Sequence, residues 1–260
     1  MATTMLWRNR VAGLALIMAC MSAVTAEVGA AEIRVFSGGA LKSAVAPLAA
    51  EFERSSGHSV KIEFVPMGPL QARLAKGERP DLVFITSDVL DVLAGSGRVE
   101  RAAARELGRV GIGVAIREGA VAPDISTPEA FRNTLLAARS LVYIDPKIGT
   151  SGKHFAEVLE RLGITEQMKS KSVLGTGGFV VEPVGRGEVE IGVHQISEIL
   201  PVKGVRMIGE LPAALQKYTV YIAVPPAGTG SGPAAALVRY LTSATARASF
   251  ASAGMSSPPQ

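Results

Sequence analysis

The stretch Ile33–Ser56, IRVFSGGALKSAVAPLAAEFERSS, decides the fold of this chain. Its opening residues 33–36 predict a short buried strand, and Ser37-Gly38-Gly39 predicts a tight turn after it. Apolar residues then recur at spacings of three and four, which is the pattern of one helical face. These residues are Leu41, Val45, Leu48, Ala49 and Phe52. We expect the helix to end near Gly57, because glycine suits the left-handed position that closes many helices.

The turn between this strand and this helix is a candidate anion site. Gly38 and Gly39 carry no side chain, so another group can approach their backbone closely. The N-terminus of a helix has free N–H groups and a partial positive charge, both of which favour a bound anion. Tight turn geometry alone would also explain the two glycines. We predict that the rest of the chain builds a cleft over this turn.

Further strand–turn–helix units follow the first one. Residues 59–64 and 82–85 read as two more strands of the same kind, and residues 140–144 and 189–193 begin a second set. Such repetition favours parallel strands with helices on both faces. In sheets of this type, ligands bind beyond the carboxyl ends of the strands.

Two strands connect the two sets. The glycine-interrupted segment 108–117 looks like a connector out of the first set, and residues 217–224 read as the return crossing. We therefore predict an α/β protein of two lobes, each a mostly parallel sheet flanked by helices, with a cleft and a hinge between them. Residues 32–111 plus 219–257 would form lobe 1, and residues 112–218 would form lobe 2.

The N-terminal residues 1–31 have the features of a secretory signal peptide. Arg8 and Arg10 precede a short apolar run over residues 11–19, and small residues offer cleavage points near 26 or 31. The lone cysteine, Cys20, lies inside this leader and loosely resembles a lipoprotein attachment site. We expect a periplasmic protein, with lipid anchoring at Cys20 as the alternative.

Charge and composition exclude some classes of function. The net charge of +4 is small for 260 residues, and aromatic residues make up 5% of the chain, so we expect no nucleic-acid partner. The three histidines do not have the spacing of zinc ligands, and we predict neither a metal nor another cofactor. We expect the protein to be a monomer.

The order of the motifs resembles that of the periplasmic molybdate-binding proteins, which are type II solute-binding proteins. The resemblance covers essentially residues 32–256. It is carried by five blocks in order, which are VFSGGAL, GERPDLVFITS, IDPKIGTSGKHFAEVLERLGI, GEVEIGV and YLTSATARASFASAGM. It implies the type II periplasmic binding-protein fold, a small anionic ligand and an ABC permease as partner.

This chain departs from the family at three hydroxyl groups. The resemblance implies a serine in the first turn, where Ala40 stands, and another in the second turn, where Met67 and Gly68 stand. The tyrosine expected after GEVEIGV falls near Gln195, with His194 beside it. Because a buried oxyanion needs its lone pairs satisfied, a polycarboxylate is the more fitting ligand. The pattern is closer to the branch that includes aconitate isomerase.

The candidate ligand-binding residues all lie in turns at strand ends. They are Gly38, Gly39, Ala40, Met67, Gly68, Thr150, Ser151, Gly177, Gly178, His194 and Gln195. Each has a structural alternative: Thr150 and Ser151 would also serve as helix caps, the glycines as loop residues, and His194 as a buried structural histidine.

Two functions remain open from the sequence. The first is a periplasmic binding protein that delivers a small anion, either a molybdate-like oxyanion or a polycarboxylate, to an ABC importer. The second is aconitate isomerase, which needs a base to move a proton between two carbons. His194 is the first candidate for this base, with Lys147 and His154 behind it.

Overall fold

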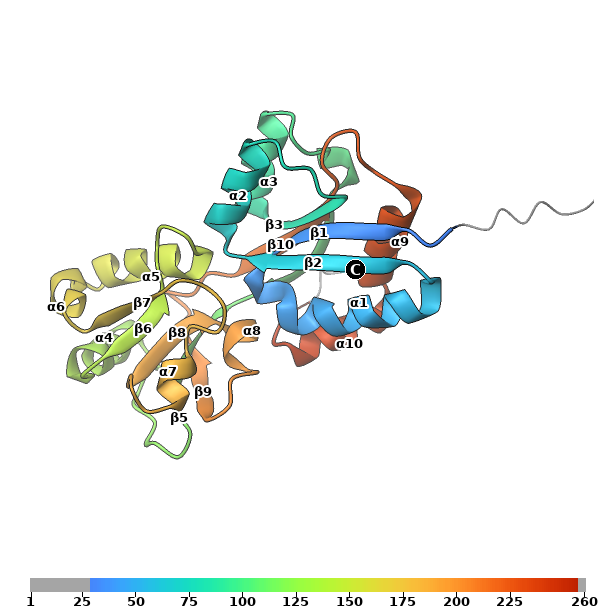
Figure 1. Cartoon of the computed structure of the whole chain (residues 1–260). Coiled ribbons are helices and arrows are strands. Elements are labelled where there is room, and N and C mark those ends of the chain that lie inside the picture. Colours follow the sequence, from blue (N-terminus) through green and yellow to red (C-terminus); the bar gives the residue numbers. More distant parts are fainter. Residues whose placement is uncertain (1–28, 257–260) are drawn as a thin grey trace, which may run out of the picture. The chain divides into compact units, whose positions relative to one another are not determined.

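The computed structural model describes residues 29–256, and within them it contains two five-stranded sheets with helices on their faces (Figure 1). Both sheets belong to one compact unit that begins at Ala31. The prediction of an α/β protein is confirmed.

The predicted signal peptide lies almost wholly outside the described residues, as does Cys20. Within the described residues, no helix has the length and apolar character needed to cross a membrane.

The first sheet has the strand order β2-β1-β3-β10-β4. Its strands are β1 (Glu32–Gly38), β2 (Ser59–Val65), β3 (Leu82–Thr86), β4 (Arg105–Val110) and β10 (Thr219–Val224). Strand β1 runs parallel to β2 and to β3, whereas β10 runs antiparallel to both of its neighbours. Four of the five strands therefore run in one direction and the returning strand β10 runs against them. The sheet is mixed, and the prediction of a mostly parallel sheet is confirmed.

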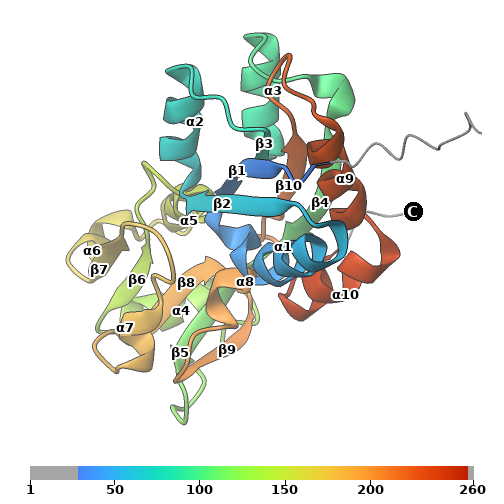
Figure 2. The same cartoon turned by 45° about the vertical axis from the view of Figure 1, so that its right-hand side comes forward.

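Helices cover both faces of the first sheet (Figures 1 and 2). They are α1 (Lys42–Ser56), α2 (Met67–Ala75), α3 (Ser87–Gly95), α9 (Gly232–Leu241) and α10 (Ala244–Ser252), with short 3-10 turns η1 (Gly39–Leu41) and η2 (Arg101–Ala103). Helices α2 and α3 lie on one face, and α1 and α10 lie against each other on the other face. The C-terminal helices thus complete the layer that the opening stretch begins.

The second sheet repeats this arrangement with the order β7-β6-β8-β5-β9. Its strands are β5 (Ile112–Arg117), β6 (Leu141–Ile144), β7 (Ser172–Gly175), β8 (Ile191–Gln195) and β9 (Val205–Glu210). Its helices are α4 (Pro128–Ala137), α5 (Thr150–Arg161), α6 (Thr165–Lys169), α7 (Glu182–Gly185) and α8 (Ile196–Ile199). Strand β5 runs antiparallel to β8 and β9, so this sheet is mixed as well.

The predicted single strand over residues 108–117 is two strands in two different sheets. Strand β4 ends at Val110 and β5 begins at Ile112, with Gly111 between them. The Gln216 side chain fixes this crossing, because its Oε1 accepts from Ile112 N at 3.0 Å and its Nε2 donates to Ile112 O at 2.9 Å. The chain passes from one sheet to the other at these crossings, which supports the predicted lobe boundaries. The boundaries themselves stay a prediction.

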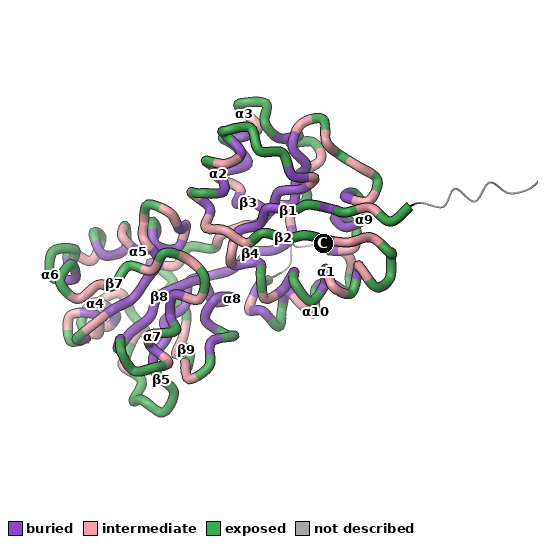
Figure 3. The backbone as a smooth tube through the Cα atoms, in the orientation of Figure 1, coloured by how far each residue is buried: buried purple, intermediate pink, exposed green. Residues whose placement is uncertain are grey.

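The helix of the opening stretch folds as its pattern predicts, while strand β1 continues to Gly38 and the predicted turn begins only at Gly39. All five apolar residues of the helical face are buried, and Gly57 ends α1 in the left-handed conformation with a φ of 73°. Strands β3 and β8 are buried over every residue (Figure 3). Ile196 of α8 packs into the core of the first sheet although its chain neighbour β8 belongs to the second. The two sheets are therefore held together by apolar contact as well as by the crossing strands.

Two pairs of candidate residues lie inside helices and not in the turns where the sequence places them. Helix α5 starts at Thr150, so Thr150 and Ser151 lie in its first turn and Gly149 holds the cap position without a side-chain bond. The capping role predicted for these two hydroxyls is therefore wrong, and both hydroxyls are free for partners in the pocket described below. Helix α2 likewise starts at Met67, which places Met67 and Gly68 in a helical turn.

Candidate functional site

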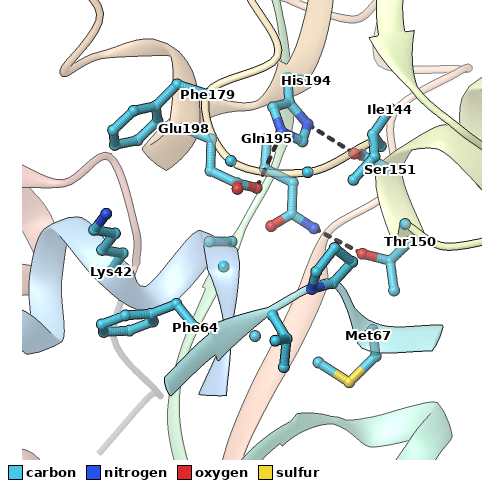
Figure 4. Close-up of a pocket in the computed structure, with 18 of the residues that line it drawn as sticks. Lys42, Phe64, Met67, Ile144, Thr150, Ser151, Phe179, His194, Gln195 and Glu198 are labelled. Carbon is cyan, nitrogen blue, oxygen red and sulfur yellow. Dashed lines mark hydrogen bonds and ion pairs between the residues drawn. The ribbon is translucent and has the colours of Figure 1, made fainter. Parts of the chain in front are cut away.

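A pocket lies where the carboxyl ends of β1, β2, β6 and β8 meet the start of α5 (Figure 4). Its volume is about 120 Å³, which suits a small ligand, since pockets for drug-sized molecules measure roughly 300–1,000 Å³. It is lined by Gly38, Gly39, Ala40, Lys42, Phe64, Val65, Pro66, Met67, Ile144, Gly149, Thr150, Ser151, Gly177, Gly178, Phe179, His194, Gln195, Glu198 and Tyr221. Both sheets thus contribute to one site.

The first glycine turn lies tightly against other parts of the pocket. A Cβ atom at Gly38 would lie 2.8 Å from Met67 Cε and 2.8 Å from Tyr221 Cε1. A Cβ at Gly39 would lie 2.9 Å from Glu198 Oε1. Real Cβ atoms do not approach other atoms this closely, so a larger residue at either position would force these side chains to move. The close approach that the sequence suggested for this turn is therefore made, in part, by the protein's own side chains.

Three polar side chains form a buried row at one wall of the pocket (Figure 4). Ser151 Oγ lies 3.0 Å from His194 Nδ1, and His194 Nε2 lies 3.3 Å from Glu198 Oε2. The contact to Glu198 is an ion-pair contact and not a well-aligned hydrogen bond. His194 is 1% exposed and Glu198 is 7% exposed. A carboxylate and an imidazole held together away from water can accept and return a proton.

Gln195 joins the two sheets beneath the pocket. Its Nε2 donates to Thr150 Oγ1 at 3.0 Å and to Thr219 Oγ1 at 3.2 Å, and its Oε1 accepts from the Tyr221 hydroxyl at 2.9 Å. Burial, and after it the negative charge of Glu198, raises the pKa of Tyr221 above that of free tyrosine. Tyr221 therefore stays protonated and remains a hydrogen-bond donor.

Positive potential in the pocket comes from few groups. Lys42 is the one lysine or arginine among the lining residues, and its Nζ lies 5.5 Å from the centre of the Phe179 ring. The first turn of α5, which holds Thr150 and Ser151, adds backbone N–H groups that have no partner within the helix. An anion here would be bound mainly by N–H dipoles and hydroxyl groups.

The structure brings together ten of the eleven predicted ligand-binding residues at this pocket. The exception is Gly68, whose N–H donates to the Ile148 carbonyl oxygen at 3.0 Å. Met67 lines the pocket through its side chain, with Cε close to Gly38. That these residues contact a ligand stays a prediction.

The other two candidate bases lie elsewhere. His154 is buried, and its Nε2 lies 2.7 Å from the Leu215 carbonyl oxygen, with Glu157 at 3.6 Å from its Nδ1. It lines a different, smaller cavity. Lys147 is exposed and is not among the lining residues. Neither residue is placed to act on a ligand in this pocket.

Sequence reasoning missed Glu198 and Tyr221. Glu198 comes four residues after His194, but His194 belongs to strand β8 and Glu198 to helix α8, so no helical periodicity links the two. Helix α8 has only four residues, which is too short to leave a periodic pattern in the sequence. Tyr221 belongs to a strand that was predicted, but only the strand order shows that β10 passes beside β3 and beneath the first turn.

Acidic, histidine and cysteine side chains do not gather into a metal site in the described part of the chain. Among residues 29–256, no group of three such side chains has an arrangement that would hold a metal ion.

Comparison with known proteins identifies the family. The model of the bacterial extracellular solute-binding proteins matches residues 33–256. Aconitate isomerase from Pseudomonas sp is 31% identical over 234 residues, which are 87% of this chain and 88% of that protein. The molybdate-binding protein ModA of Escherichia coli K12 is 25% identical over 241 residues, which are 90% of this chain and 92% of that protein. The chain belongs to the bacterial extracellular solute-binding protein family.

Solved structures agree on the fold. The periplasmic molybdate-binding protein of Azotobacter vinelandii superimposes with a TM-score of 0.73 at 18% identity, over 87% of this chain and all of that one. A periplasmic thiamin-binding protein superimposes with a TM-score of 0.70 at 12% identity, over 88% of this chain and 84% of that one. The chain therefore has the type II periplasmic binding-protein fold, as the sequence predicts.

Proposed function

We propose that the pocket binds a small polycarboxylate and that the protein is an isomerase of the aconitate isomerase type. The observation that carries this proposal is the buried His194–Glu198 pair at the wall of an otherwise glycine-rich and hydroxyl-rich pocket. A carboxylate in such a place can take and return a proton, whereas it lowers the affinity for an anion that offers only acceptor oxygens. The similarity to the Pseudomonas aconitate isomerase supports the same function.

The reaction needs one base that takes a proton and gives it back. In aconitate, the base removes a proton from the methylene carbon, and the C–H electron pair forms a new carbon–carbon double bond. The electrons of the old double bond then take the proton at its far carbon, so the double bond moves and no atom is gained or lost. A single positioned acid–base group typically contributes about 10²–10⁴-fold to such a rate.

Glu198 is the member of the pair that faces the ligand. Both ring nitrogens of His194 face protein groups, Ser151 on one side and Glu198 on the other. Glu198 Oε2 faces His194, and Oε1 lies toward the first glycine turn. We therefore assign proton abstraction to Glu198, with His194 as the positioning residue behind it, and this refines the assignment to His194 made from the sequence.

The negative charge that develops on the substrate would be met by the N-terminal turn of α5 and by Lys42. Fixed N–H dipoles aimed at a developing charge stabilise the transition state without reorganising during the reaction. A small pocket that excludes water also keeps the abstracted proton from exchanging before it returns.

The test is interconversion of cis- and trans-aconitate by the purified protein without an added cofactor, followed by ultraviolet absorbance. We expect activity in the wild type, a loss of about 10²–10⁴-fold in Glu198→Gln, and unchanged activity in Glu160→Gln. Glu160 is an exposed glutamate on α5 outside the pocket, so it is a matched control for the change of charge. Activity that survives in Glu198→Gln would refute the assignment of the base.

A transport receptor is the second candidate function, and the similarity to ModA favours it. In this case the protein would bind its anion in the periplasm and deliver it to an ABC permease. Thermal unfolding with molybdate, tungstate, sulfate, citrate and both aconitates distinguishes the candidates. A ligand at 100 times its dissociation constant adds about 2.7 kcal/mol to the free energy of unfolding. Stabilisation by molybdate or tungstate alone would favour the receptor.

The family description, extracellular solute-binding protein, supports the predicted periplasmic location. N-terminal sequencing of the protein recovered from the periplasmic fraction would test both the location and the cleavage near residue 26 or 31. Sequencing that begins at Met1 would contradict the predicted signal peptide. The predicted monomer is open to test by light scattering on the same sample.

A further inference from the structure

The negatively charged carboxylate of Glu198 would repel an anion that binds in this pocket. Its side chain is about nine-tenths buried, and His194 is the single ionisable partner within ion-pair distance among the described residues. No hydrogen bond found within residues 29–256 ends on Oε1, which lies against the turn at Gly39. Oε1 is not among the buried polar atoms that lack a partner, so it is open to the pocket. A ligand that displaces water from Oε1 must give it a hydrogen, because an acceptor left without a donor is costly.

We propose that Glu198 determines ligand specificity by rejecting oxyanions that present only acceptor oxygens. The pocket then selects anions that turn a hydrogen-bearing group, an O–H or an acidic C–H, toward Glu198. Sulfate and molybdate are excluded by this rule, because every oxygen they offer repels the carboxylate at this distance. Hydrogen phosphate, which has nearly the size and charge of sulfate but carries one proton, is allowed.

The carboxylate is held where it is by both sheets. Helix α8 follows directly from β8, which belongs to the second sheet, while Ser43 Oγ of α1 donates to the Ser197 carbonyl oxygen at 3.0 Å. Ile196, on the same helix, packs into the core of the first sheet. A helix fixed at both sides keeps Glu198 at the pocket wall, so the side chain does not withdraw when a second negative charge enters.

The surrounding groups do not neutralise the negative charge of the Glu198 carboxylate. The ionisable groups around it are His194 from β8, Lys42 from α1 and Tyr221 from β10. No ion pair joins Lys42 to Glu198 in the described part of the chain, and Tyr221 donates its proton to Gln195. The positive charge of Lys42 is therefore available to bind a ligand, and the negative charge of Glu198 is available to discriminate between ligands.

This inference deepens the proposed function, and it rests on the pocket being an anion site but not on catalysis. It also explains how the substrate is oriented. An aconitate that enters this pocket turns its methylene hydrogens, and not a carboxylate, toward Glu198. The residue that excludes the wrong anions thus faces the atom from which a proton must leave.

The experiment measures dissociation constants for hydrogen phosphate, sulfate and molybdate by isothermal titration at pH 8. The proteins are the wild type, Glu198→Gln, Glu198→Asp and Glu160→Gln. In the wild type we expect phosphate to bind at least tenfold more tightly than sulfate or molybdate. In Glu198→Gln, sulfate and molybdate should gain at least tenfold, which is about 1.4 kcal/mol, because the amide donates an N–H to them. Glu198→Asp keeps the charge, and Glu160→Gln keeps the pocket, so both should keep the preference for phosphate.

Equal affinities of the wild type for phosphate and sulfate would overturn the inference, and so would unchanged sulfate and molybdate affinities in Glu198→Gln with a native circular dichroism spectrum. Failure of the isomerase assay alone would leave these binding results unaffected. The two proposals can therefore fail separately.

Discussion

Two tyrosines offer a matched test of the polar network beneath the pocket. Tyr221 is 2% exposed, and its hydroxyl donates to Gln195 Oε1 at 2.9 Å. Tyr218 is 48% exposed, and its hydroxyl donates to Glu210 Oε2 at 2.7 Å. Replacing either tyrosine by phenylalanine removes one hydroxyl and no carbon atom. The two variants therefore differ in the burial and the partner of the hydroxyl that is lost.

The expected loss of stability is large only at the buried position. Tyr221→Phe leaves the Gln195 carbonyl oxygen without its donor in the interior, which costs about 1–3 kcal/mol. For a protein of this size, that loss corresponds to a fall in Tm of about 2–12 °C. Tyr218→Phe breaks an exposed contact to a charged group, which contributes about 0–1 kcal/mol.

The pH dependence of stability gives a second measurement on the same pair. Burial raises the pKa of Tyr221 in the folded protein, while in the unfolded chain tyrosine titrates near pH 10. Its contribution to stability is therefore complete below about pH 10 and is lost as the pH rises toward the folded pKa. We expect Tyr221→Phe to lose stability less steeply than the wild type above pH 10.

Circular dichroism melts of the three proteins at pH 7, and between pH 9 and 11, make the comparison. Equal losses in the two variants at pH 7, or a larger loss in Tyr218→Phe, would refute the reasoning that the Gln195 network is buried and satisfied. A parallel alkaline decline in Tyr221→Phe and the wild type would refute the pKa argument.

Three further substitutions and one control variant test the pocket and its supports. Gly38→Ala places a methyl carbon 2.8 Å from Met67 Cε and from Tyr221 Cε1, so ligand affinity measured by titration should fall by about tenfold or more. Gly152→Ala brings a Cβ to 1.9 Å from the Ile144 carbonyl oxygen and should lower the free energy of unfolding in urea by about 1–3 kcal/mol. Gly95→Ala is the control, because a Cβ there meets open space, and its free energy of unfolding should not fall. Ser151→Ala leaves His194 Nδ1 without its partner at 3.0 Å and should cost about 1–3 kcal/mol as well as slow isomerisation.

The order of strands and helices could be predicted because each unit repeats the same local signals. The apolar spacing of the opening helix, the proline at the start of α4 and the glycine that ends α1 each act through neighbouring residues. Thr127 caps α4 by accepting from Ala130 N at 3.1 Å. Local patterns of this kind require no knowledge of the sheet to which a strand belongs.

The pairing of strands could not be predicted in the same way. Residues 108–117 have one continuous pattern, yet they divide at Gly111 between two sheets. Strand direction depends on the partner, and β10 meets β3 only after a separation of more than a hundred residues in the sequence. The sequence therefore predicts that the sheets are mostly parallel, but not that β10 and β5 run against the other strands.

The polar wall of the pocket is partly visible in the sequence. The sequence points to His194 because it comes at the end of a buried run, and strand β8, which contains it, does end beside the pocket. Glu198 was missed because its importance comes from two long-range contacts, the packing of α8 on α1 and the approach of Gly39. The residue that we place at the centre of the chemistry is therefore the one that only the assembled structure reveals.

The central claim is tested most directly by incubating the wild-type protein separately with pure cis-aconitate and pure trans-aconitate and following both by proton NMR. The account predicts that both samples reach the same final ratio of isomers, without an added cofactor, and that each isomer raises the Tm of the protein. The account is contradicted if both isomers stabilise the protein against heat and neither is converted.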